Sequence, residues 1–398
     1  MPVAAVPTYL GTDFQHASPG MRFGMYLPLW ERGSWSKSKD KPLDHTKKLN
    51  ANDQKTMQAL FSRQQQAFDA LASADTGLRL DARSIAPFTT GLGNEHPLEN
   101  GFAFLNPYGL PYLPGSGVKG VLRQAARELA SGEWGEKYGW SEAPRYELEV
   151  GNKTTALSLL DVLLGRETPE GDTDHVRGAL SFWDVIPQIK GDSLLVEIMT
   201  PHQSHYYQQT PNPKSGGSVT PHDSGQPTPI AFLTVPPESR FTFHVVCDHA
   251  HLNRLAPDLA DLDPATGKPR WQSLITAALE EHAFAWLGFG AKTAVGYGAM
   301  QRMSEAQVAA DRQRADADRL RCDWVDEVVG ELARKNRAPE SDTLRSKGLA
   351  ERWSALTDAD LKARALADIR ARWMKEGWWD SPQGSSAKKA KAIYEAGT

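Results

Sequence analysis

The run "LPGSGVKGVLR", which ends at Arg123, combines residue types that could hold an anion. Gly115 and Gly117 allow the backbone to bend close to a ligand. We expect Ser116 to be the N-cap of the helix that follows, with Lys119 and Arg123 four residues apart on one face of it. Amides at a helix N-terminus and a lysine in the first turn favour a phosphate group. The alternative is an ordinary capped helix whose cations are solvated.

A second candidate is the glycine-rich stretch "GFGAKTAVGYG", residues 288–298. It is not a Walker A loop, because Ala291 stands where a glycine must precede the lysine. It is not a dinucleotide fingerprint either, because it follows a predicted helix and not a strand. We interpret it as a flexible, amide-rich loop that suits a nucleic-acid backbone and a stacked base, the alternative being a tight helix-to-strand turn. Its candidate contact residues are Gly288, Gly290, Lys292, Thr293 and Tyr297.

The third candidate is "MTPHQSHYYQ", residues 199–208, in which His202 and His205 lie three apart. Two histidines at this spacing could ligate a metal or do acid–base work. No clear third ligand or partner carboxylate accompanies them locally, so neither a metal site nor a catalytic residue is predicted. Tyr206 and Tyr207 could stack on bases, and with His202 they are predicted RNA contacts.

A hydrolase was considered as well. Ser116 and Lys119 have the S-x-x-K spacing of serine β-lactamases, and Lys292 with Thr293 matches half of their K-T-G motif. However, Ala294 replaces the motif's glycine, and no S-D-N occurs in the chain. The sequence therefore does not favour this enzyme class.

Composition sets the limits for these sites. The chain has 398 residues, 40% of them hydrophobic, and a formal net charge of −4, so any nucleic-acid site must be a local patch. Cys247 and Cys322 cannot build a disulfide framework or a cysteine-rich zinc site, which indicates a reducing setting. No secretory signal or membrane-spanning run is predicted. We expect a cytoplasmic protein without a cofactor and without a membrane partner.

The elements that position these segments fall into three predicted regions. Residues 1–75 form an N-terminal extension with one helix, and residues 304–398 a charged helical appendage in which Trp378 and Trp379 either dock a partner or pack on their own domain. Residues 76–303 alternate strands and helices in an order that predicts an α+β, ferredoxin-like sheet with an inserted hairpin. The predicted strands are 78–86, 178–187, 194–201 (with Leu194, Val196 and Ile198 on one face), 229–235 and 240–247, and a helix over 271–287 is expected to carry His282 and Trp286 on its apolar stripe.

Together, "LPGSGVKGVLR", "GALSFWDVIP", "LLVEIMTPHQSHYY" with "PTPIAFLTV", and "LGFGAKTAVGYG" resemble the RAMP superfamily of CRISPR proteins. Within it, the histidine–tyrosine segment followed by the proline-flanked strand is most similar to the sixth-subunit family of Cmr-type, type III-B effector complexes. The resemblance covers the middle region. Gly117 departs from the second serine that is commoner in the family, and the C-terminal appendage has no recognised counterpart.

The resemblance implies a ferredoxin-like, non-catalytic RNA-binding core that holds the 3′ part of a guide RNA in antiviral defence. Target-RNA cleavage would belong to the repeated backbone subunit of the complex and nucleotide-cyclase chemistry to its large subunit. The implied partners are guide RNA, target RNA, the repeated backbone RAMP subunit, the small helical subunit and another RAMP subunit. Carried over by position, the residues facing guide RNA would be Ser116, Lys119, Arg123, Lys292, Thr293 and Tyr297.

Two alternatives stay open at this point. The chain could be a metal-independent CRISPR RNA-processing endoribonuclease that uses His202 or His205 as its base. It could also be a pure assembly scaffold whose glycine-rich loops only turn corners.

Overall fold

The computed structural model describes residues 2–38, 42–150, 152–166, 175–200, 206, 220, 229–320 and 322–396. The chain divides into two compact units, Met1–Met303 and Ser304–Thr398. The N-terminal residues belong to the first unit and do not form a body of their own. Among the described residues, no helix has both the length and the apolar character needed to span a bilayer.

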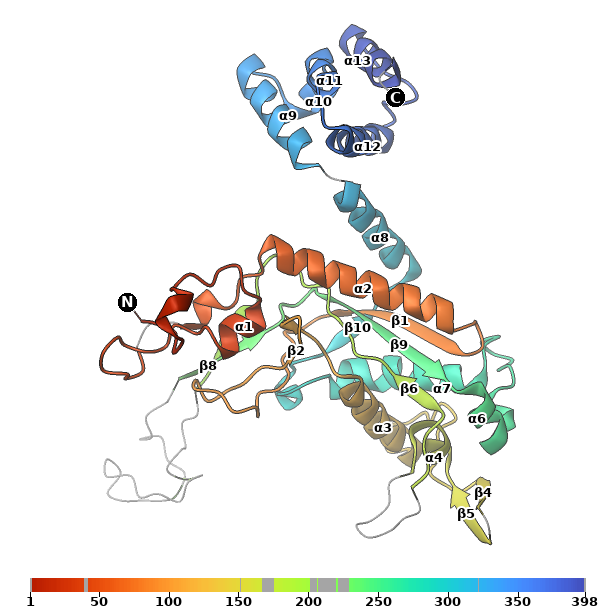
Figure 1. Ribbon diagram of the computed structural model, residues 1–398. Coiled ribbons are helices and arrows are strands. Elements are labelled where there is room, and N and C mark those ends of the chain that lie inside the picture. The colour runs from red at the N-terminus through yellow and green to blue at the C-terminus, as the bar shows by residue number, and fades with distance from the viewer. Residues whose placement is uncertain are drawn as a thin grey trace. The chain divides into compact units, whose positions relative to one another are not determined.

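The first unit is built on a four-stranded antiparallel sheet with the order β10-β1-β9-β6 (Figure 1). The segment that connects β1 to β6 contains one long helix among shorter elements, and the segment that connects β9 to β10 contains a helix that continues as a π-helix. The first unit is thus a mixed α+β unit. The bounds are β1 Gly77–Ser84, α3 Gly115–Ser131, β6 Leu180–Phe182, β9 Arg240–Cys247, α7 Arg270–Ala277, the π-helix η5 Ala278–Leu287 and β10 Met300–Arg302.

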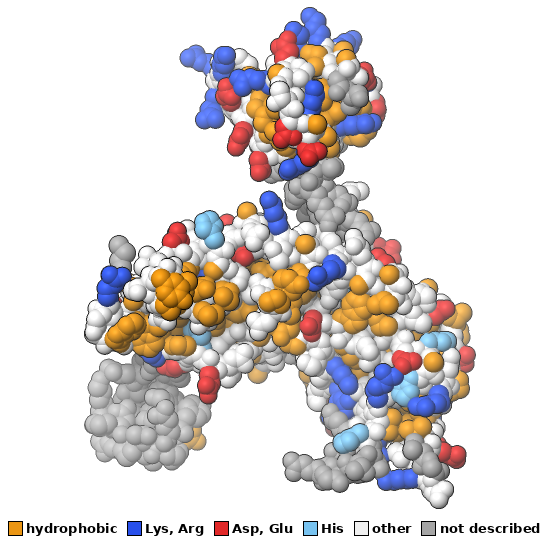
Figure 2. All heavy atoms as spheres, in the orientation of Figure 1, with side chains coloured by type: hydrophobic (Ala, Val, Ile, Leu, Met, Phe, Trp, Pro, Cys, Tyr) orange, Lys and Arg blue, Asp and Glu red, His pale blue; other side chains and the backbone are white. Residues whose placement is uncertain are grey.

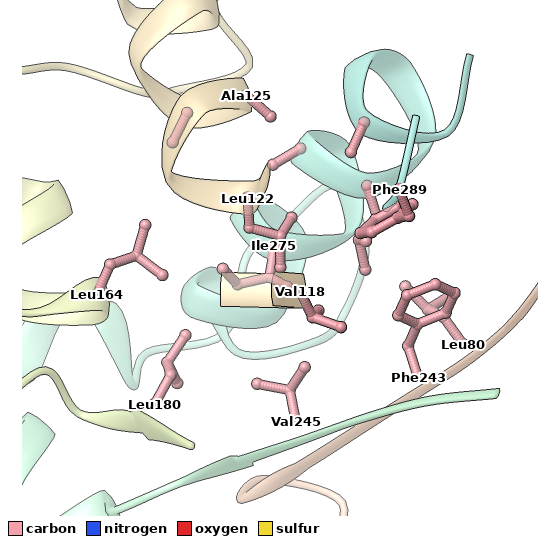
Figure 3. Close-up of a cluster of buried hydrophobic side chains, with 14 of the residues drawn as sticks. Leu80, Val118, Leu122, Ala125, Leu164, Leu180, Phe243, Val245, Ile275 and Phe289 are labelled. Atoms are coloured by element: carbon pink, nitrogen blue, oxygen red, sulfur yellow. The ribbon is translucent and has the colours of Figure 1, made fainter. Parts of the chain in front are cut away.

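The core of this unit lies between the sheet and the two connecting helices. Residues alternate along β1, with Leu78 opposite Val245 and Leu80 opposite Phe243 on β9, so one face of the sheet is apolar. In Figure 3, Val118 and other side chains of α3 lie over this face beside those of α7. The strand prediction for β1 and β9 and the helix prediction after Pro114 are confirmed.

The predicted stripe of the second helix is only partly right. His282 is buried as expected, but Trp286 is 65% exposed. The reason is the π-helix Ala278–Leu287, whose i→i+5 hydrogen bonds widen each turn. A stripe drawn at α-helical spacing therefore drifts off the core before it reaches Trp286.

Helix α2, Ala51–Leu71, covers the other face of the sheet, and it begins with a capping box between Asn50 and Asp53. In Figure 1, α2 runs along one side of β1 and β9, while α3 and α7 lie on the other side. The Arg240 guanidinium lies 5.5 Å from the ring centroid of Phe61 on α2, and α2 also contributes an ion pair with Arg79 of β1. Neither flat face of the sheet is therefore open.

Under α2 the sheet carries a buried histidine, His244 of β9, which is 2% exposed. Its ring lies 4.8 Å from that of Phe68 and 5.8 Å from that of Trp183, centroid to centroid. Neither ring nitrogen has a hydrogen-bond partner among the described residues. Burial, and then the positive charge of Arg79, lower the pKa of His244 to about 4, so the ring is neutral in the folded protein at pH 7.

Three short ribbons and several small helices surround the sheet. Ile198 shares a face with Val196 in β7, as predicted from alternation, but it is 63% exposed because its ribbon pairs outside the main sheet. The N-terminal extension has α1 as well as the expected helix. The bounds are α1 Pro19–Gly24, β2 Phe104–Leu105 with β3 Leu110–Pro111, β4 Tyr146–Val150 with β5 Lys153–Leu157, α4 Leu159–Leu164, β7 Leu195–Met199 with β8 Ile230–Thr234, and α6 His249–Leu255.

The second unit is helical, as expected, and has its own apolar core around Trp353, Trp373 and Tyr394. Trp379 is 9% exposed and packs 5.8 Å from Trp373, while Trp378 lies under the guanidinium of Arg345. The tryptophan pair therefore packs on its own unit. The helices are α8 Glu305–Leu320, α9 Asp323–Asn336, α10 Glu340–Leu344, α11 Lys347–Ser354, α12 Ala359–Lys375 and α13 Ser385–Ala396.

Candidate functional site

Helix α3 begins two residues earlier than predicted. Its N-cap is Pro114, so the expectation that Ser116 caps the helix is wrong. The cap is supplied from elsewhere in the chain, because the Gly115 amide donates to Asp184 Oδ1 at 2.7 Å. A Cβ on Gly115 would clash with the Phe182 carbonyl of β6. Gly115 thus allows the helix to meet β6, and a carboxylate already takes its amide.

The other candidate residues of this turn differ in their burial and in their hydrogen bonds. Ser116 is exposed, and Gly117 and Lys119 are half-buried. Arg123 Nη2 donates to the carbonyls of Leu164 at 2.6 Å and Gly165 at 2.9 Å. These carbonyls end α4, so Arg123 joins α4 to α3. Its contact with RNA stays a prediction, but its guanidinium already has a structural role.

The 288–298 loop is a pinned turn and not the flexible loop expected. The amides of Ala291 and Gly298 donate to the carbonyls of Thr89 and Pro87, each at 2.8 Å. Gly298 has a φ of 72°, and a Cβ there would clash with the Phe289 carbonyl. These residues therefore fit the alternative interpretation, a tight helix-to-strand turn, because only glycine avoids a backbone clash where the chain passes from the helix to β10.

Between the pinned ends of this loop, Lys292 and Thr293 keep some capacity for a ligand. Neither backbone amide donates a hydrogen bond to another described residue. Lys292 has a φ of 61°, in the left-handed region, and its Nζ lies 5.2 Å from the ring centroid of Phe232 on β8. Successive amides in such a turn form a concavity that suits an anion. Phe232 was not predicted as part of this site, because an apolar strand residue carries no sequence signal for ligand binding.

Tyr297 packs against the same strand, with its ring centroid 5.9 Å from that of Phe232. Burial, and then the carboxylate of Glu197, raise the pKa of Tyr297. The β7–β8 ribbon that carries Phe232 and Glu197 leads into and out of the third candidate segment. His202, His205 and Tyr207 lie outside the described residues, and Tyr206 is 38% exposed.

The two glycine-rich segments lie beside strands of the same sheet, at different heights along it. Strands β1 and β6 are both antiparallel to β9 and therefore run parallel, but Phe182 is level with Val245 and Leu78, six residues before Ser84. Gly115 lies beside Phe182, the last residue of β6. Residues 288–298 lead into β10, where Met300 pairs with Ser84, the last residue of β1. From the strand spacing and register, the two glycine-rich segments are on the order of 20 Å apart at the level of the strands.

A further group of cations, which the sequence analysis missed, surrounds α6. The His251 ring is hydrogen-bonded to the Arg177 carbonyl and to Arg254, and Arg177 forms an ion pair with Asp248. Figure 2 shows Lys, Arg and His side chains gathered over this part of the first unit. No group of three or more His, Cys, Asp or Glu in the described ranges is placed to hold a metal ion.

Comparison with known proteins gives one family match. A family model described as the RAMP superfamily matches residues 81–301. The protein "CRISPR system Cmr subunit Cmr6" of Pyrococcus furiosus is 28% identical over 237 residues, which are 52% of this chain and 63% of that protein. This chain therefore spans less than two thirds of the length of that relative.

Solved structures give weaker likenesses. A chain of "Type III-B Cmr-beta bound to cognate target RNA" is 17% identical with a TM-score of 0.39, covering 66% of this chain and 69% of the other. "Cmr6 from Pyrococcus furiosus" is 23% identical with a TM-score of 0.29, covering 57% and 98%. A chain of a "Type IV-B CRISPR Complex" is 16% identical with a TM-score of 0.31, covering 57% and 89%.

Proposed function

Because the chain belongs to the RAMP superfamily, we propose that it is a non-catalytic RNA-binding subunit of a type III-B CRISPR effector complex, acting in antiviral defence. The likeness to Cmr6 supports this assignment. The observation that carries it is that the two glycine-rich turns, each with a lysine, both flank the one sheet, on the order of 20 Å apart. We infer that the sheet is the ferredoxin-like RAMP core, with the β7–β8 ribbon as its inserted hairpin.

Guide RNA would run between these two turns, along the rim of the sheet. The flat faces of the sheet are covered by α2 on one side and by α3 and α7 on the other. The rim of the sheet is therefore the surface left for an RNA strand. The amides of Lys292 and Thr293, with the side chains of Lys292, Lys119 and Ser116, would contact phosphates, and Tyr297 or Tyr206 would stack on a base. Phosphate contacts carry no sequence information, which suits a subunit that must accept any guide.

The absence of catalysis is part of the proposal. Neither glycine-rich turn contains a histidine or a carboxylate that could act as the base for a nucleophile. Target RNA and the neighbouring Cmr-type subunits would be partners. Incubating the purified chain with repeat RNA checks this: we expect no specific cuts, and cuts that disappear in His202→Ala would establish the nuclease instead.

The RNA-binding proposal is tested with Lys119→Ala combined with Lys292→Ala in the full chain. We expect weaker binding of single-stranded RNA, and a plot of log K against log salt whose slope is shallower by about 1.4, for two lost phosphate contacts. The matched control is Lys268→Ala, an exposed lysine in the loop that precedes α7. Equal affinity and equal slope in the double variant and the control would contradict the proposal.

A further inference from the structure

Two exposed tryptophans lie side by side on the first unit, at the end of α3 and on η5. Trp134 is 50% exposed and Trp286 65% exposed, and their ring centroids are 5.5 Å apart. Tyr138, 40% exposed, follows in the same loop. We call Trp134, Tyr138 and Trp286 the aromatic patch. Large aromatic side chains gathered on a surface are typical of an interaction site.

The patch is held from beneath by a buried polar pair. His282, 1% exposed, is hydrogen-bonded through Nε2 to the Glu128 carboxylate of α3. The Trp134 ring stands edge-on to the His282 ring, with centroids 4.8 Å apart. Trp286 follows His282 by four residues on the π-helix. The π-helix thus presents Trp286, the turn after α3 presents Trp134, and the packing of Trp134 on His282 lowers the conformational entropy lost when a partner binds.

Three carboxylates, of Glu133, Glu136 and Glu281, outnumber the single cation of the loop, Lys137. Glu133 precedes Trp134 in the chain, and Glu136 is exposed in the same loop. The pKa of Tyr138 is raised, by desolvation first and then by the neighbouring Glu281 carboxylate. Carboxylates repel an RNA backbone and attract cationic side chains. In a symmetric contact with a second copy they would also face one another.

We propose that the aromatic patch docks a segment of another protein that places an arginine or lysine side chain on the indoles. The cation would stack on Trp134 or Trp286 as a cation–π contact, and the surrounding carboxylates would pair with its charge. This inference stands on the geometry of the patch and does not depend on RNA binding at the glycine-rich turns.

A photo-cross-linking experiment identifies the occupant. The full chain, tagged and produced in its own cells, carries p-benzoylphenylalanine in place of Trp286, and the same residue in place of Trp35, which is 60% exposed, is the control. We expect position 286, but not position 35, to capture one peptide of another protein that contains arginine or lysine. Capture of RNA or of this chain itself, or a yield no higher than the control's, would overturn the proposal.

Charge and ring variants test the stated chemistry. Glu281→Lys is expected to lower the cross-link at least fivefold, and the matched control Glu95→Lys, at an exposed glutamate elsewhere, to leave it unchanged. The double variant Trp134→Ser with Trp286→Ser should abolish co-purification of the captured protein. Its circular dichroism spectrum and the salt dependence of its RNA binding should match those of the control variant Trp35→Ser. Retained co-purification, or loss of RNA binding alone, would count against protein docking.

Discussion

The two glycine-rich turns look alike in the sequence, yet the fold uses them differently. At the start of α3 the chain supplies its own acceptors, because Asp184 takes the Gly115 amide and the end of α4 takes Arg123. In the 288–298 loop the ends are pinned, but two successive amides at Lys292 keep no described acceptor. Glycines with a nearby cation therefore do not define an anion site by themselves. What decides is whether the folded chain already provides the negative partner.

The largest expected effect comes from the pinned end of the second turn. Gly298 and Gly296 both have positive φ values, 72° and 92°, but only Gly298 faces backbone atoms that a Cβ would strike. We expect Gly298→Ala to lower the free energy of unfolding of the first unit by about 4 kcal/mol, and Gly296→Ala by about 1 kcal/mol. Denaturant unfolding of both variants measures the difference, and equal losses would show that the loop is not pinned at Gly298.

A pH effect should separate the two turns. The backbone carbonyl of His244 accepts a hydrogen bond from the amide of Trp183. The next residue, Asp184, accepts the hydrogen bond from the Gly115 amide at the start of α3. Its pKa of about 4 lies below the ordinary 6.5, so the neutral ring contributes stability above pH 6.5 that is lost as the pH falls towards 4, by at most about 3 kcal/mol.

Amide hydrogen exchange measured between pH 7 and 4, corrected for intrinsic rates, checks this effect. Exchange in residues 113–123 should accelerate before exchange in residues 288–298. In His244→Phe, which cannot titrate, the difference between the two segments should disappear. Simultaneous loosening of both segments in the unsubstituted chain would argue against the link through Trp183.

The smallest effect tests the comparison most directly. Asp184→Ala removes the acceptor of the Gly115 amide and should lower the free energy of unfolding by about 1 kcal/mol. It also removes a carboxylate from the helix N-terminus, so RNA affinity should rise severalfold. Asp192→Ala, at another aspartate of the same connection, is the control. Unchanged RNA affinity in Asp184→Ala would mean that the start of α3 is not on the RNA path.

Local pattern predicted the frame of the fold well, because alternation and helical spacing report burial directly. The strand that contains Leu78 and Leu80 and the helix that buries Val118 are examples. Ser116 was assigned as a cap because nothing local shows that Asp184, many residues later, reaches the Gly115 amide. Such long-range acceptors have no sequence spacing to detect.

Two further features escaped prediction for different physical reasons. The π-helix changes the angular step per residue, so Trp286 moves from the core to the surface without any change in composition. The helix of the N-terminal extension was predicted, but the surface that it covers was not, because that sheet face carries Arg79 and Arg240 and therefore resembles a solvated surface in the sequence.

The position of α2 has a consequence for how a nucleic acid would be held. An RNA strand that lies flat on a sheet stacks its bases on side chains, whereas an RNA strand that crosses the rim of the sheet is bound through its backbone at a few points. With both broad sides of this sheet occupied, a guide carried over the rim would keep most of its Watson–Crick edges turned outward, ready to pair with a complementary strand.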